Sequence, residues 1–176
     1  MLEVGLLDPG PVFPFETEYR NKRRRAIDNV QNREFHLELT GKAWSAGDPE
    51  QTRLQQTELL AALVTNKNLQ SVQLGYDFFS NLSEEQDQAR VFHRITNLPA
   101  LSRLSVKGSA GAPGIIHTPV LLRALTNTHN NLEALTVWNI VLSNESELDQ
   151  LVEVVRPPMG RSLARLSLKL VVSTTA

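Results

Sequence analysis

The chain of 176 residues is long enough to bury the core of one domain, and its composition is that of a folded protein, with 41% hydrophobic and 21% charged residues. Its 18 Lys and Arg residues balance 19 Asp and Glu residues, which argues against attraction of the whole surface to nucleic acid or to an anionic membrane. The lack of cysteine excludes disulfides, thiolate metal sites and a cysteine nucleophile. It also favours an intracellular protein, so we expect a cytoplasmic or nuclear location.

The N-terminal segment is rich in turn-forming residues. Residues 1–20 contain the sequence Asp-Pro-Gly-Pro at 8–11, which predicts turns and extended chain rather than a core element. This segment lacks the pattern of a signal peptide, and no apolar run in the chain reaches the ~18 residues of a membrane helix. We interpret the basic run at 21–25 as the solvated start of a helix; the alternative is a nuclear import signal or a nucleic-acid contact. Residues 1–33 are therefore expected to form a partly irregular N-terminal extension.

From residue 35 onward the chain repeats an apolar–x–x–apolar–x–apolar pattern. A partial match is Leu37-x-Leu39, and the four full matches begin at Leu69, Leu101, Leu132 and Leu163. The central apolar residues, at 37, 72, 104, 135 and 166, are 35, 32, 31 and 31 residues apart. A nearly constant spacing of this size is typical of a solenoid of stacked repeats.

Each repeat combines two periodicities. Alternation of apolar and polar residues at the end of each match predicts a short strand with one buried face, which should bury Leu104 and Leu135. Apolar residues at helical spacing follow between the strands. We expect strands near 35–40, 70–75, 102–107, 133–138 and 164–169, and helices near 52–66, 84–97, 118–129 and 146–156. Residues 34–176 are thus predicted to form an α/β curved solenoid, with a parallel sheet on the concave side and helices on the convex side.

The repeated Leu-x-x-Leu-x-Leu core resembles the leucine-rich repeat family, in its longer, ribonuclease-inhibitor-like class. The resemblance covers residues 35–170 and implies protein binding rather than catalysis. The period of 31–32 residues exceeds the family's usual period of about 20–29. The family's Asn or Cys after the strand is replaced by Asp77, Ser109, Ile140 and Val171. No helix follows the last strand, so we expect the C-terminal cap of the stack to be missing.

Catalytic patterns are weak, and we predict that the chain is not an enzyme and needs no metal or cofactor. None of the histidines His36, His93, His117 and His129 is paired at the spacing of a zinc-binding helix, so each is interpreted as a surface residue. The glycine-rich segment 108–114 could cradle a phosphate, but it lacks the lysine and the spacing of known phosphate loops. We interpret it as a loop between repeats.

The side of the sheet away from the helices is the candidate binding face. Alignment of the repeats gives three columns of outward-facing residues, which change from mixed or acidic at the N-terminal end to basic at the C-terminal end. The proposed partner-binding residues come from the first and third columns and are Arg103, Lys107, Trp138, Arg165 and Lys169. The alternative is an ordinary solvated face on which Trp138 stacks on a lysine.

The sequence therefore predicts a non-catalytic scaffold that binds a partner protein, with an acidic surface, on the concave sheet face. We expect no membrane partner and no nucleic acid. Two alternatives remain open. The chain could regulate a partner enzyme, in the manner of a small-GTPase activator or a nuclease inhibitor, or it could recognise substrates within a larger adaptor or receptor.

Overall fold

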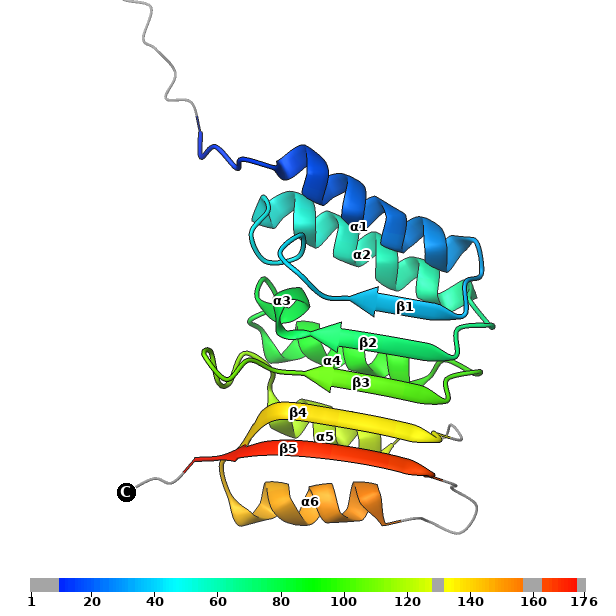
Figure 1. Ribbon diagram of the computed structural model, residues 1–176, viewed down its shortest axis with the longest axis vertical. Helices are drawn as coiled ribbons and strands as arrows, with labels where there is room; N and C mark the ends of the chain where they lie inside the picture. Colours follow the sequence, from blue (N-terminus) through cyan, green and yellow to red (C-terminus); the bar gives the residue numbers. More distant parts are fainter. Residues whose placement is uncertain (1–9, 128–131, 157–162, 174–176) are drawn as a thin grey trace, which may run out of the picture.

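The computed structural model describes residues 10–127, 132–156 and 163–173. This part of the chain is an α/β structure with a five-stranded parallel sheet of order β1-β2-β3-β4-β5 (Figure 1). The strands are β1 His36–Leu39, β2 Ser71–Gly75, β3 Arg103–Lys107, β4 Ala134–Leu142 and β5 Arg165–Val172. The helices are α1 Glu16–Gln31, α2 Pro49–Thr65, α3 Tyr76–Phe79, α4 Glu85–Thr96, α5 Thr118–Thr126 and α6 Glu145–Val155.

The predicted α/β class and the parallel sheet are confirmed. All five strands and four of the helices lie where the two periodicities place them, although β4 and β5 extend several residues further than expected. The end of the helix predicted over 118–129 falls on 128 and 129, which lie outside the described residues. Within the described ranges, none of the helices has the length and the apolar character that crossing a bilayer requires.

The register of the sheet matches the alignment of the repeats. Leu37 lies beside Val72, Val72 beside Leu104, and Leu104 beside Leu135. These side chains point towards the helices, and Leu104 and Leu135 are only 2% and 1% exposed. The prediction that both are buried is therefore confirmed.

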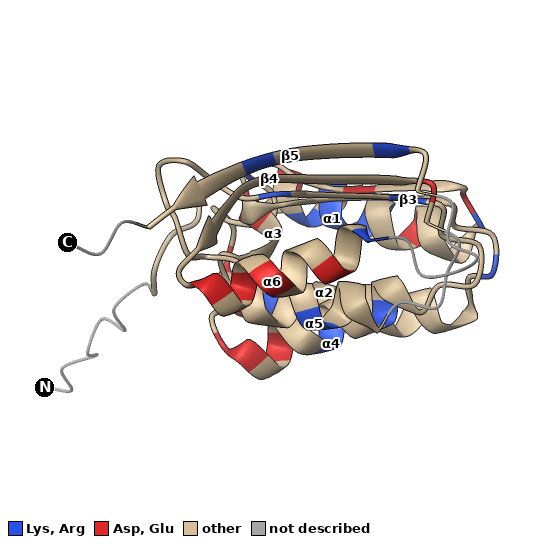
Figure 2. Cartoon of the chain, turned by 90° about the horizontal axis from the view of Figure 1, so that it is seen from below, with Lys and Arg blue, Asp and Glu red and all other residues tan. Residues whose placement is uncertain are grey.

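The helices α2, α4, α5 and α6 lie on one side of the sheet, and the described part of the chain leaves the opposite side uncovered (Figure 2). Local signals fix where some of them begin. The side chain of Asp48 accepts a hydrogen bond from the backbone N–H of Glu50 (3.0 Å) at the start of α2, where Pro49 occupies the first turn. At the start of α6, the side chain of Asn144 accepts from the N–H of Glu147 (2.9 Å). We call the uncovered side the open face.

Helix α1 packs against α2 and adds Ile27 and Val30 to the buried core. It begins at Glu16, inside the segment for which turns and extended chain were predicted, so that prediction is wrong for residues 16–20. The short helix α3 was not predicted either.

The basic run lies within α1, so the predicted helix is confirmed, but the run occupies the middle of the helix rather than its start. One member departs from the expected solvated character, because Arg23 is completely buried. Its Nε donates to Gln55 Oε1 (2.6 Å), its Nη1 donates to the carbonyl of Ala43 (2.5 Å), and its Nη2 pairs with Glu16. Arg23 thus ties α1 to α2 and to the loop that precedes α2.

Candidate functional site

The five predicted binding residues lie on the open face. Lys107 is the register partner of Trp138 on the neighbouring strand, and Trp138 is the partner of Lys169. Arg103 and Arg165 flank Ala134 in the same way. The predicted arrangement is therefore present, because Trp138 lies between Lys107 and Lys169. The two arginines lie about four residues away along β3 and β5.

Trp138 is exposed and held by its neighbours. Its side chain is 39% exposed, the Lys107 Nζ lies 5.1 Å from the ring centroid, and the indole Nε1 donates to Ser167 Oγ (2.9 Å). A cation at this distance from an indole ring is attracted by the π-electron density. Contacts on both sides restrict the indole, so a partner that binds it loses little side-chain entropy.

The charged side chains of β3, β4 and β5 are all basic. The outward-facing residues of β3, β4 and β5 include Arg103, Lys107, Arg165 and Lys169 but no Asp or Glu. Figure 2 shows Lys and Arg, but no Asp or Glu, along β5. Within the ranges that the structure describes, none of these four cations forms an ion pair. Their charge is therefore available to an acidic ligand.

A β-bulge directly follows the tryptophan and was not predicted. The register of β4 against β5 shifts between Trp138 and Ile140, and Asn139 adopts the left-handed backbone conformation with φ 54°. Asparagine tolerates this conformation better than most residues, which is the one signal that the sequence offered. The bulge lets Trp138 point outward while Ile140, only two residues later, is buried.

Gly108 supports the bulge from the neighbouring strand end. Its N–H donates to the carbonyl of Trp138 (2.8 Å), and a Cβ at this glycine would lie 2.4 Å from the carbonyl oxygen of Asn139. Only glycine permits this approach. The first residue of the glycine-rich segment thus has a structural role in positioning Trp138, which was not predicted. The segment connects β3 to α5, as predicted for a loop between repeats.

The three histidines in the described ranges do not gather into a site. His36, His93 and His117 make separate hydrogen-bond contacts with Ser71 (3.0 Å), with Asn97 (3.2 Å) and with the carbonyl of Ser83 (2.8 Å). His129 lies outside the described residues. Across the described ranges, no group of three or more His, Asp or Glu residues has the arrangement of a metal site.

In comparisons with known proteins, no family model matches the chain, and no curated protein matches it.

Proposed function

We propose that the chain is a non-catalytic protein-interaction module of the leucine-rich-repeat type, which binds an acidic segment of a partner protein on its open face. In this proposal the strand–helix units form a curved solenoid, and the open face is its concave side. The repeat spacing of 31–32 residues and the single layer of helices support the architecture.

The observation that carries the proposal is the exposed indole of Trp138 on a face with four cations that form no ion pair with any described residue. Protein interfaces concentrate their binding energy in a few residues, and Trp and Arg are the most frequent among them. An aromatic anchor between Lys107 and Lys169 favours an apolar residue flanked by carboxylates in the partner. The cations also accelerate encounter with an acidic partner, so the association rate should fall as salt is added.

The test compares proteins captured from a lysate by the parent chain and by three variants. Trp138→Ala removes the anchor, and the double variant Lys107→Glu/Lys169→Glu reverses the flanking charge. The control is Lys42→Glu/Lys67→Glu, which makes the same change of net charge at exposed loop residues outside β3, β4 and β5.

A partner of the open face is retained by the parent and the control and is lost from both open-face variants. Titration of the purified partner should then show binding at least about tenfold weaker for each open-face variant, which corresponds to about 1.4 kcal/mol. If both variants bind with unchanged affinity while their circular dichroism matches that of the parent, the open face is not the binding site.

A further inference from the structure

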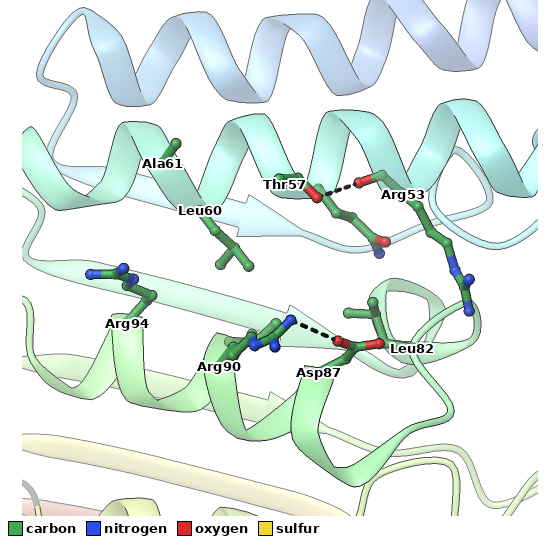
Figure 3. Close-up of a pocket in the computed structure, with 10 residues that line it drawn as sticks. Arg53, Thr57, Leu60, Ala61, Leu82, Asp87, Arg90 and Arg94 are labelled. Carbon is green, nitrogen blue, oxygen red and sulfur yellow. Dashed lines mark hydrogen bonds and ion pairs between the residues drawn. The ribbon is translucent and has the colours of Figure 1, made fainter.

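A groove runs between α2 and α4 on the helix-covered side, opposite the open face (Figure 3). It has a volume of ≈ 470 Å³. The helices α2 and α4 pack less closely on each other than α4 packs on α5, which leaves room for the groove. It is lined by Arg53, Gln56, Thr57, Leu60, Ala61, Leu82, Asp87, Arg90, Val91 and Arg94.

The floor of the groove is apolar and firmly held. Leu82 and Val91 are buried, and Leu60 is half-buried above them. Gln56 Nε2 donates to the carbonyl of Phe78 (2.7 Å), which fixes this side chain against α3. The floor can therefore receive an apolar side chain without rearrangement.

The rim is cationic. Arg53, Arg90 and Arg94 are exposed, and the carboxylate of Asp87 is the single acidic group among the lining residues. Arg53 Nε donates to the carbonyl of Asn81 (3.1 Å), which holds this arginine at one end of the groove. Arg90 lies 3.4 Å from Asp87, a long contact between exposed groups that contributes little stability. Within the described ranges, Arg94 has no ion pair at all.

The lining residues follow the helix axes rather than enclosing a compact cavity. On α2 they run from Arg53 to Ala61, which is about 12 Å or roughly two turns. A second hollow shares Arg53 and Thr57 and continues along α2 past Leu54, which is 58% exposed. This shape fits a peptide segment better than a small molecule.

We propose that this groove binds an acidic amphipathic helix of a partner protein. Arg90 and Arg94 are one helical turn apart, about 6 Å along α4. Carboxylates at positions i and i+4 of a helix lying along the groove have the same spacing and can pair with both arginines. An apolar residue on the same side of that helix then rests on Leu60 and Val91, as in other helix-in-groove complexes. This site is separate from the open face and does not depend on the function proposed above.

The experiment measures fluorescence anisotropy of a labelled, Ala-rich synthetic peptide of about four helical turns. The probe carries Leu between two Glu residues at i and i+4, and a matched peptide carries Gln in place of each Glu. We expect the parent to bind the Glu peptide at least about tenfold more tightly than the Gln peptide, with binding that weakens as salt is added.

Two variants test the groove, and two serve as controls. Arg90→Glu/Arg94→Glu should weaken binding of the Glu peptide at least about tenfold. Ala61→Trp, at an exposed position, should block the groove sterically. Lys42→Glu/Lys67→Glu makes the same charge change elsewhere and should bind as the parent does, and so should the open-face variant Lys107→Glu/Lys169→Glu.

Circular dichroism of each variant verifies that it is folded. The proposal is overturned if the parent does not bind the Glu peptide, if it binds both peptides equally, or if the control loses affinity as much as Arg90→Glu/Arg94→Glu. Displacement of the peptide by citrate alone at concentrations similar to that of the peptide would identify a small-anion site and would also overturn it. Loss of peptide binding only in the open-face variant would assign the peptide to the open face instead.

Discussion

Replacement of Gly108 by alanine tests whether the backbone beside Trp138 is as tightly fitted as the structure indicates. The added Cβ would lie 2.4 Å from the carbonyl oxygen and 3.1 Å from the carbonyl carbon of Asn139. Ordinary contact begins at 3.4 Å, so the backbone of β4 must retreat by about 1 Å. The atoms in the way belong to a strand paired on both sides, so they cannot move independently of the bulge.

The cost should be that of overpacking, about 1–3 kcal/mol. Gly111→Ala is the matched control, because its Cβ would meet nothing nearer than Ser109 Oγ at 3.8 Å. That substitution should stabilise the chain slightly, by about 0.4–1 kcal/mol, because alanine restricts the unfolded state. The two variants should therefore differ by about 1.4–4 kcal/mol, or by about 0.7–2 M in the midpoint of urea unfolding for a slope of about 2 kcal/mol per M.

Two-dimensional NMR of the indole N–H groups gives a second measurement. The chain has two tryptophans, and Trp44 is buried in the core at 3% exposure while Trp138 lies on the open face. Gly108→Ala should shift the signal of Trp138, because the displaced bulge disturbs its hydrogen bond to Ser167, and should leave that of Trp44 unchanged. In the unfolding experiment, equal urea midpoints for Gly108→Ala and Gly111→Ala would show that Gly108 is not tightly packed against the backbone of Asn139.

Two further predictions concern the stability of the fold. Leu104→Ala or Leu135→Ala should each lower the free energy of unfolding by about 2–5 kcal/mol, because each leaves a cavity between the sheet and the helices; melts that match the parent would show that the register is misassigned. Arg23→Met should cost about 3–5 kcal/mol in denaturant unfolding, because it leaves buried hydrogen-bonding groups without their cation. Arg25→Met, at an exposed position of the same basic run, is its control, and equal losses in both would contradict the role of Arg23.

The sheet could be predicted because its signal is repeated. Each strand alternates apolar and polar residues, and the strands recur at a steady interval, so the alignment of the repeats also gives the register. This is why the sequence alone predicts that Lys107, Trp138 and Lys169 are neighbours. Their role in binding remains a prediction.

Other features left no periodic signal. A basic run usually lies on a solvated surface, and the burial of Arg23 depends on acceptors from distant segments, among them Gln55 and the carbonyl of Ala43. The bulge at Asn139 depends on the close approach of Gly108 from another repeat. The groove between α2 and α4 depends on the distance between these two helices, which the sequence does not reveal. In the sequence, Arg53 and Arg94 look like ordinary surface residues.

The position of β5 at the edge of the described sheet gives the proposed binding site on the open face a second property. Leu166 and Leu168 continue the inward-facing rows of Leu135 and Val137, yet they are 42% and 37% exposed. These two side chains bury less apolar surface than their counterparts on the inner strands, so the amide hydrogens of β5 should exchange with solvent sooner than those of β2 and β3. Because the Trp138 indole already bonds to Ser167 on β5, a ligand that bridges Trp138 and Lys169 would join the outer strand to its neighbour. Binding of such a ligand and local opening of β5 are thermodynamically linked. A bound ligand would therefore slow the exchange of amide hydrogens along β5.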